Sequence, residues 1–284
     1  MDRNEMLKQI QAIDNLPTLP HIALAVNRML QDEESPMEQL AALLEKDQSL
    51  VLKLLRLVNS SFFGFKSKVK SVRHAVTLLG YNTVQNAVIT VSVIDTLSLK
   101  NELKGFDITQ FWEHAIHVAV LSKHLAAKTR VAPAEEAFTA GLLHDIGKVV
   151  LANFFPEVLI QVLQTVDAKA ITFAGAEQTL EMVSHSLVGS HLAQRWMLPE
   201  SLVATIKWHH SGIQRAPQSV LAALVDISDT IVHIMAGENG YHLKLEALDA
   251  SVKTPLVTFF QADPQWFREV KTEMRQACEF FQQG

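Results

Sequence analysis

The chain has 284 residues, which is enough for one large domain or two modest ones with a substantial core. Hydrophobic residues make up 48% and charged residues 19%, and this balance excludes a disordered chain. The net charge of −5 argues against a broad nucleic-acid surface, because such surfaces neutralise phosphates with clustered Lys and Arg. Cys278 is the only cysteine, so the sequence excludes an internal disulfide and a metal cage made of thiolates.

The N-terminal segment gives no sign of export. The stretch MDRNEMLKQIQAIDNLP carries charges throughout and lacks the apolar core of a signal peptide. No uninterrupted apolar run approaches the ~20 residues that span a bilayer. A single cysteine also fits a reducing compartment. We therefore expect a cytoplasmic protein that makes no membrane contact.

Helical periodicity dominates the chain, and the segment SPMEQLAALLEKD, residues 35–47, opens with the capping-box pattern of a helix. Segment 48–58 carries a stripe of leucines at helical spacing, and the next segment starts at a capping Ser71 and ends at Gly80. Residues 81–97 contain enough β-branched side chains to form a strand. The spacing of the valines also fits a helix, with Asn82 as its cap. We predict a helix there, and further helices at about 108–130, 133–144, 148–154, 156–167, 175–182, 184–196, 199–209, 217–236 and 264–282.

A polar stretch in the middle of the chain is the best candidate for a boundary. The segment SLKNELKGFD, residues 98–107, contains Gly105 and shows no apolar periodicity. We predict an all-α fold with two helical lobes, 1–105 and 106–284. Residues 240–284 are expected to add helices that pack on the second lobe.

The stretch AFTAGLLHDIGKVVL, residues 137–151, places His144 and Asp145 side by side among apolar residues. Burying such a pair is costly unless a metal or a hydrogen-bonded core satisfies both groups. Asp226 and Asp229 lie three apart and therefore on one helical face. The chain has 12 histidines, and most lie in the second lobe: His114, His117, His124, His144, His185, His191, His209, His210, His233 and His242.

A single histidine on an apolar helix face is more often a core residue than a ligand. Several imidazoles and carboxylates on the inner faces of successive helices are, however, typical of metal sites in helical bundles. Nitrogen and oxygen ligands without sulfur suit Mn, Fe, Co, Ni or Zn, and Mg where carboxylate and water dominate. Spacing alone leaves both interpretations open, because it does not establish that the side chains converge.

Several segments resemble known families. GLLHDIGKVVL is similar to the HD-domain signature of metal-dependent phosphohydrolases. The wider chain, over residues 13–236, resembles the HDOD family, bacterial signalling domains related to the HD and HD-GYP groups. The matching segments are LPTLPHIALAVNRML, DQSLVLKLLRLVNSSFFG, VKSVRHAVTLLGYNTVQNAVI, FWEHAIHVAVLSKHLA, SHSLVGSHLAQRWMLPESLVATIKWHH and LVDISDTIV.

The resemblance implies a metal site and its ligands. The HD metal quartet falls on His114, His144, Asp145 and Asp229, all present here, whereas many HDOD members have lost part of it. HD-GYP proteins place ligands of a second metal at positions that match His185, His209 and His210. One or two divalent ions (Fe, Mn, Ni, Zn or Mg) are therefore expected. The segment HHSGIQRAP lacks the acidic residue and the Gly-Tyr-Pro of HD-GYP proteins, which argues against cyclic-di-GMP hydrolysis.

Three functional hypotheses follow. In the first, an HDOD signalling protein hydrolyses a phosphoester or nucleotide; Asp145 bridges two metals, and Lys148 either contacts a substrate phosphate or pairs with Asp145. In the second, the protein is a non-catalytic module that binds signalling proteins or a nucleotide messenger, and its metal is structural. In the third, the histidines form a core without metal.

Two further features match no ligand position or chemical role. His117, His124, His191 and His233 are expected in the core or on the surface. In SSFFGFKSKVKSVRH, residues 60–74, basic residues alternate with phenylalanines, a pattern that superficially suits single-stranded nucleic acid. We favour a solvated loop with aromatic anchors.

Overall fold

The structure, a computed structural model, describes residues 3–12, 16–30, 37–60, 68–211 and 219–282. Within these ranges every regular element is a helix, apart from one isolated antiparallel bridge between Leu103 and Phe106. The predicted all-α fold class is therefore confirmed. The first six helices are α1 (Arg3–Gln11), α2 (His21–Leu30), α3 (Met37–Leu44), α4 (Gln48–Val58), α5 (Val72–Leu79) and α6 (Tyr81–Thr96).

The remaining elements belong to the second half of the chain. Most of them lie within a few residues of the predicted helices. They are α7 (Ile108–Thr129), α8 (Ala134–Leu143), α9 (Ile146–Phe154), α10 (Pro156–Lys169), α11 (Phe173–Thr179), α12 (His185–Arg195), α13 (Glu200–Trp208), α15 (Val220–Met235), the 3₁₀ turn η1 (Leu245–Ala247), α16 (Ala250–Ala262) and α17 (Trp266–Gln282).

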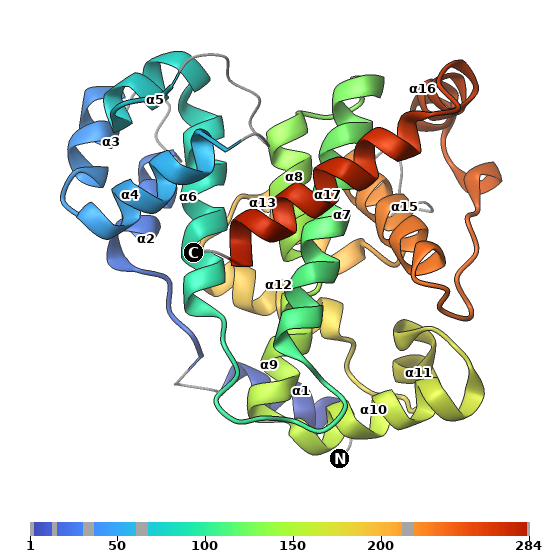
Figure 1. The fold of residues 1–284 in the computed structure, drawn as a ribbon. Helices are drawn as coiled ribbons and strands as arrows, with labels where there is room; N and C mark the ends of the chain where they lie inside the picture. Colours follow the sequence, from blue (N-terminus) through green and yellow to red (C-terminus); the bar gives the residue numbers. More distant parts are fainter. Residues whose placement is uncertain (1–2, 13–15, 31–36, 61–67, 212–218, 283–284) are drawn as a thin grey trace.

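Helices α2 to α6 gather on one side of the molecule (Figure 1). Side-chain caps start α4 and α5, where Asp47 accepts a hydrogen bond from the N–H of Leu50 and Ser71 accepts one from the N–H of His74. Helix α6 has no such cap; Gly80 precedes it, and Asn82 lies inside the helix rather than capping it.

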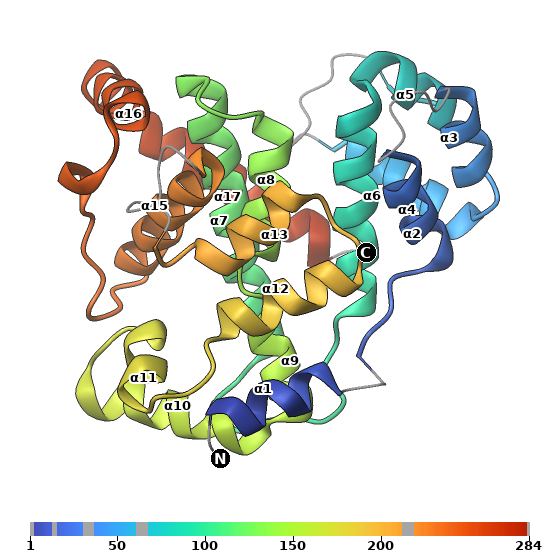
Figure 2. The same ribbon diagram turned by 180° about the vertical axis from the view of Figure 1, so that it is seen from behind.

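Helix α6 joins the two groups of helices. Every residue from Val84 to Val93 is buried, because α6 packs on α2, α4 and α5 on one side and on α8 on the other (Figures 1 and 2). A helix that is buried all round needs no polar face, which explains why its β-branched sequence could pass for a strand.

Helix α7 is the axis of the second group, with α8, α15 and α17 packed around it (Figure 1). The contact with α8 is close at Gly141, where a Cβ atom would lie 2.8 Å from the Cα of Ala119. Among the described residues, no single helix is long and apolar enough to cross a bilayer; only a pair bent by 120°, Ala134–Phe154 with Pro156–Lys169, reaches that length and composition.

The N-terminal segment crosses to the second group. Helix α1 lies beside α9 and α10 in both views (Figures 1 and 2). The indole Nε1 of Trp196 donates a 2.7 Å hydrogen bond to the carbonyl oxygen of Pro17. The carboxamide of Asn27 in turn donates to the carbonyl of Trp196 over 3.4 Å. The lobe boundary at residue 105 stays a prediction.

The C-terminal residues form α16 and α17. Helix α17 was predicted at 264–282, whereas α16, which contains Pro255, was foreseen only as additional helix. Helix α17 crosses α7 and buries Val270, Met274 and Ala277. Its end reaches the first group, where Arg56 of α4 lies 5.4 Å from the ring centroid of Phe280.

Candidate metal centre

The adjacent residues His144 and Asp145 lie at a break between two helices. His144 follows the last residue of α8, and Asp145 precedes the first residue of α9. The backbone N–H of Lys148 donates to the carbonyl of Asp145 over 2.8 Å and so tightens the first turn of α9. This break turns both side chains toward the same interior point, which a continuous helix would not do, since neighbours in a helix point about 100° apart.

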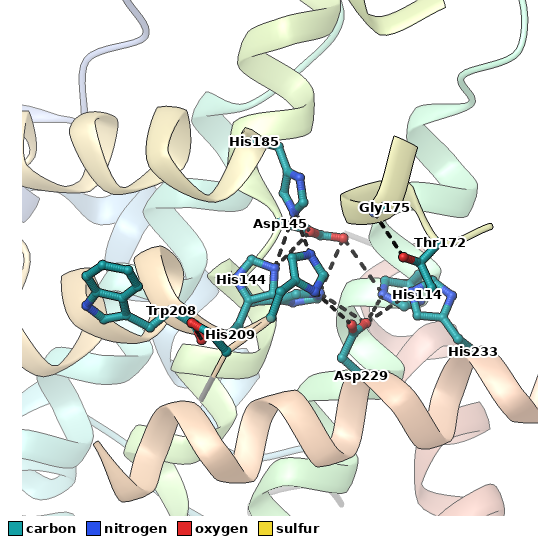
Figure 3. Close-up of polar contacts among 12 residues, drawn as sticks. His114, His144, Asp145, Thr172, Gly175, His185, Trp208, His209, Asp229 and His233 are labelled. Atoms are coloured by element: carbon teal, nitrogen blue, oxygen red, sulfur yellow. Dashed lines mark hydrogen bonds and ion pairs between the residues drawn. The ribbon is translucent and has the colours of Figure 1, made fainter. Parts of the chain in front are cut away.

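Three side chains from three helices surround the first half of the site (Figure 3). The Nε2 atom of His114, on α7, lies 3.0 Å from Oδ1 of Asp229, on α15. Nε2 of His144 lies 3.5 Å from the same Oδ1 atom and 3.3 Å from Oδ2 of Asp145. One ligand atom each of His114, His144 and Asp229 lies within 4.8 Å of the others.

Three histidines surround the other half. Oδ1 of Asp145 lies 3.0 Å from Nε2 of His185 and 3.5 Å from Nε2 of His209. Nε2 of His210 lies 3.0 Å from Nε2 of His185. One ligand atom from each of these four residues lies within 4.8 Å of the others. The structure thus brings together all seven residues expected from the sequence, in two groups that meet at Asp145; Figure 3 labels all of them except His210.

Helix α12 approaches α9 closely enough to place His185 beside Asp145. A Cβ atom on Gly147 would lie 1.9 Å from the carbonyl oxygen of His185 and 2.7 Å from the nitrogen of Gly189. Gly189 faces it, since a Cβ there would lie 2.9 Å from the nitrogen of Gly147. Only glycine permits such an approach of two backbones.

Hydrogen bonds to the ring Nδ1 atoms orient the histidines. Nδ1 of His144 donates to the carbonyl of Gly141 over 2.6 Å, and Nδ1 of His209 donates to that of Ile206 over 2.8 Å. Because a carbonyl oxygen only accepts, Nδ1 carries a proton in both rings and Nε2 is the nitrogen that faces the site. This is the arrangement that metal-ligating histidines commonly show.

The donor atoms fit a divalent metal. Among the described residues, Nε2 of His144 and Oδ1 of Asp145 are buried without a hydrogen bond of acceptable geometry. Buried polar atoms of this kind are costly to leave unpaired. Imidazole nitrogens and carboxylate oxygens would satisfy Mn, Fe, Ni or Zn, so the clusters could bind metal.

Burial and neighbouring charges set the protonation of the ligands. Burial lowers the pKa of His114 to about 4, despite the opposing effect of Asp229. Burial also lowers the pKa of His209 and, together with the neighbouring imidazoles, that of His210 well below its usual value. These imidazoles are therefore neutral near pH 7, as ligands must be.

Neighbouring charges oppose the effect of burial on the pKa values of His144 and Asp145. The pKa of Asp145 is held well below its usual value, against burial, by His144 and Lys148. Burial would lower the pKa of His144, but Asp145 and Asp229 raise it to about 10. Without a metal, a proton on His144 therefore balances the buried carboxylates.

Glu177 was not foreseen from the sequence. This buried side chain on α11 accepts a 2.6 Å hydrogen bond from the backbone N–H of His185 and a 2.9 Å hydrogen bond from Nδ1 of His185. It therefore fixes the ring so that Nε2 faces Asp145. No motif marks Glu177, because its pairing depends on the turn between α11 and α12.

His233, expected in the core or on the surface, is buried and lies at the edge of the site (Figure 3). Its Nε2 atom lies 3.1 Å from Oδ1 of Asp229, one turn earlier on α15, and its Nδ1 atom lies 2.9 Å from Glu238. The ring stacks on Tyr241 with centroids 3.9 Å apart. The spacing of four residues from Asp229 was the available signal.

The side chain of Lys148 points toward Asp145. Its Nζ atom lies 2.5 Å from Oδ2 of Asp145 and 4.6 Å from the ring centroid of Phe173. The expected ion pair with Asp145 is thus present, and a contact with a substrate phosphate stays a prediction. Of the basic run, residues 61–67 with Phe62, Phe63, Phe65 and Lys66 lie outside the described residues.

A cavity of about 510 Å³ opens beside the two groups. His114, Asp145, Lys148 and His233 line it on the side of the metal ligands. Aromatic and acidic side chains form much of the remaining wall: Phe106, Phe111, Phe173, Tyr241, Asp107, Asp167 and Glu238. Among the described residues, Lys148 is the only Lys or Arg in the wall.

The fold and this helix-built site define the class of the protein. The HDOD domain family matches residues 16–212, which is more than half of the chain. The chain therefore belongs to the HDOD family, as the motifs indicated.

Curated relatives match parts of the chain. An uncharacterized protein of Treponema pallidum is 30% identical over 232 residues, which cover 81% of this chain and 44% of that protein. A Ribonuclease Y of Lawsonia intracellularis is 31% identical over 140 residues, 49% of this chain and 20% of that protein. The chain thus spans less than half the length of these curated relatives.

An HDOD domain protein of unknown function from Geobacter sulfurreducens shares the fold over almost the whole chain. Its crystal structure has a TM-score of 0.74 and 27% identity and covers 97% of this chain and 96% of that one. A second crystal structure, of a Shewanella amazonensis protein whose name proposes a phosphohydrolase, has a TM-score of 0.72 and 24% identity. It covers 98% of this chain and 97% of that one. At that identity the second likeness concerns the fold alone.

Proposed function

We propose that this HDOD protein is a divalent-metal-dependent phosphohydrolase that acts on a small phosphoester of nucleotide size. The observation that carries the proposal is the position of Asp145, whose two carboxylate oxygens face two separate groups of ligands at the wall of one cavity. His114, His144 and Asp229 would hold one ion with Asp145. His185, His209 and His210 would hold the other ion with the second oxygen of Asp145.

The chemistry would be shared between the ions and the side chains. Two bound ions would supply a water of lowered pKa and neutralise charge on a phosphoryl oxygen. Lys148 would bind a phosphate oxygen, since its ammonium lies in the cavity wall beside Asp145. Phe173 would hold the Lys148 side chain in place through its ring face.

The cavity favours a substrate with few charges. Lys148 is the one Lys or Arg among the described wall residues, while Asp107, Asp167 and Glu238 add negative charge. A polyphosphate or an RNA chain would be repelled by these carboxylates. Phe106, Phe111 and Tyr241 offer aromatic surface on which a base could stack. A nucleoside monophosphate or a phosphomonoester of similar size fits both features.

A signalling or scaffold module without turnover is the alternative. It is favoured by the ion pair of Lys148 with Asp145, which neutralises the carboxylate without a metal. Signalling proteins would then be the partners, and any metal would be structural.

Metal analysis joined to a substrate panel tests the proposal. Wild type should contain near-stoichiometric divalent metal and hydrolyse nucleoside monophosphates or related phosphomonoesters. Asp145→Asn should lose metal and activity, and Lys148→Gln should keep metal but lose about 10–100-fold in kcat/KM. Asp95→Asn, on the exposed carboxylate that pairs with Lys53, is the matched control and should change neither. Full metal loading without turnover on any phosphoester would overturn the catalytic proposal.

A further inference from the structure

A second cluster of side chains that could bind a metal lies between α7 and α17. Glu113 and His117 are one helical turn apart, and Cys278 of α17 packs against them. One ligand atom from each of the three residues lies within 4.8 Å of the others. Glu113 and Cys278 also line a cavity of about 310 Å³, which is distinct from the cavity at Asp145.

We propose that Glu113, His117 and Cys278 form a zinc site that clamps α17 to α7. The site combines one thiolate, one imidazole and one carboxylate, a set of donors that suits Zn²⁺ in tetrahedral coordination with water in the fourth position. The single cysteine excludes a cage of thiolates but allows a site with one thiolate. The proposal is independent of phosphoester hydrolysis.

The geometry needs only a small adjustment. Ligand atoms about 2.0–2.3 Å from a tetrahedral zinc lie roughly 3.3–3.8 Å from one another. The present separations of up to 4.8 Å therefore require the side chains to close by about 1 Å. Glu113 is exposed and His117 is partly exposed, so both are free to rotate, whereas Cys278 is buried and fixed by the packing of α17.

The three side chains are available for a ligand. Within the described part of the chain, none of them takes part in a hydrogen bond or a disulfide, and Glu113 and His117 interact with each other only through their charges. His117 belongs to the histidines for which the HD resemblance assigns no ligand role. An unengaged imidazole, thiol and carboxylate within a few ångströms of one another point to an exogenous cation.

The electrostatics of the cluster agree with cation binding. Burial lowers the pKa of His117, so its imidazole is neutral near pH 7. Burial, Glu113 and Glu279 together raise the pKa of the Cys278 thiol to about 11. The same negative charges attract a divalent cation, which would deprotonate the thiol on binding and release one proton.

The position of the cluster gives α17 a structural role. Helix α17 crosses α7, and its end contacts α4 through Phe280 and Arg56. A zinc ion at Cys278 would therefore fasten a helix that links the two groups of helices. It would also hold α7 next to His114, which directly follows Glu113 in the chain.

Cobalt titration of the full chain tests the site directly. Cys278 is the only thiol, so near-ultraviolet charge-transfer absorption between sulfur and Co²⁺ arises only if Cys278 binds the ion. The ligand groups around Asp145 contain no sulfur and give no such band. Wild type and Asp145→Asn should both show the band, and Cys278→Ser should lack it.

Two further variants test the other ligands. His117→Gln and Glu113→Gln should each weaken Co²⁺ binding at this band by about 10-fold or more, as expected for loss of one ligand. Glu279→Gln, on an acidic residue outside the cluster, should keep the band. Zn²⁺ should displace Co²⁺ and protect Cys278 from thiol reagents, and in an Asp145→Asn background, which lacks the centre at Asp145, it should raise the Tm only when Cys278 is present.

Two results would overturn the zinc site. One is the absence of a charge-transfer band in folded wild type at excess Co²⁺. The other is a band of unchanged affinity in both His117→Gln and Glu113→Gln, because a thiol that binds cobalt without these partners is not part of a site. Thiol protection measured in His117→Gln keeps the test valid if Cys278→Ser folds poorly.

Discussion

Oδ1 of Asp145 lies 3.0 Å from Nε2 of His185, while its other oxygen, Oδ2, lies 3.3 Å from Nε2 of His144. One carboxylate therefore faces both groups of ligands. The ring of His185 is held in this position by Glu177, and α12 reaches Asp145 because two glycines allow α9 and α12 to touch. These contacts determine which substitutions should remove one metal and which should remove both.

The shared carboxylate predicts different metal losses for two conservative variants. In a Cys278→Ser background, which excludes any ion held by Cys278, Asp145→Asn removes a charged oxygen from both groups, so the metal content should fall to near zero. Asp229→Asn removes a charged oxygen only from the group of His114 and His144, so about one ion should remain. Elemental analysis after dialysis, with circular dichroism as a check on folding, measures both. Equal losses in the two variants would contradict the shared role of Asp145.

Glu177→Gln should weaken the group that contains His185. The carboxylate accepts two hydrogen bonds from His185, and a carboxamide has one oxygen to accept them. Loss of such a supporting hydrogen bond costs about 10–100-fold in metal affinity. Isothermal titration should therefore show weaker binding at the group of His185 and unchanged binding elsewhere. Glu269→Gln, on an exposed partner of Lys128, serves as the matched control, and an unchanged profile in Glu177→Gln would refute the role.

The metal-free protein should lose stability in mild acid through His114. Its folded-state pKa of about 4 is below the usual 6.5, so its contribution is full above pH 6.5 and is lost as the pH falls toward 4. Between pH 7 and pH 4.5 this loss amounts to about 2–3 kcal/mol of unfolding free energy. Urea denaturation with a chelator present should therefore show a steeper decrease for wild type than for His114→Asn. Parallel decreases would show that His114 is not buried as a neutral imidazole.

Much of the centre could be predicted because its residues interrupt apolar patterns. His144 and Asp145 stand out among leucines and valines, and the motifs around His114, His185 and Asp229 placed the rest. Glu177 could not be found in this way, since its contact with His185 depends on a turn between two helices. His233 had a signal, its spacing from Asp229, but a histidine at helical spacing is usually a core residue.

The fold was predictable to a similar degree. Periodicity gave the long helices, including α6, where burial on all sides weakened the amphipathic pattern. The bounds of α16 were not predicted, because a proline such as Pro255 normally argues against a helix at that position. Tertiary packing also brings Trp196 to the carbonyl of Pro17, a contact between segments far apart in the chain that no local pattern encodes.

Gly147→Ala should separate α9 from α12. The added Cβ would lie 1.9 Å from the carbonyl oxygen of His185, and backbone atoms cannot yield as a flexible side chain can. We expect a loss of more than about 3 kcal/mol of unfolding free energy, as for a severe overpacking change. In variant molecules that still fold, the group of His185, His209 and His210 should bind metal more weakly.

Gly237→Ala carries the same chemical change at a site with free space and is the control. Gly237 has a φ of +75°, and no atom lies within 4 Å of the position that an added Cβ would take, so its cost should be the backbone strain alone, about 1–2 kcal/mol. Thermal denaturation and elemental analysis of both variants compare the two effects. A Gly147→Ala protein that is as stable as Gly237→Ala and keeps its full metal content would show that close contact of α9 and α12 does not position His185.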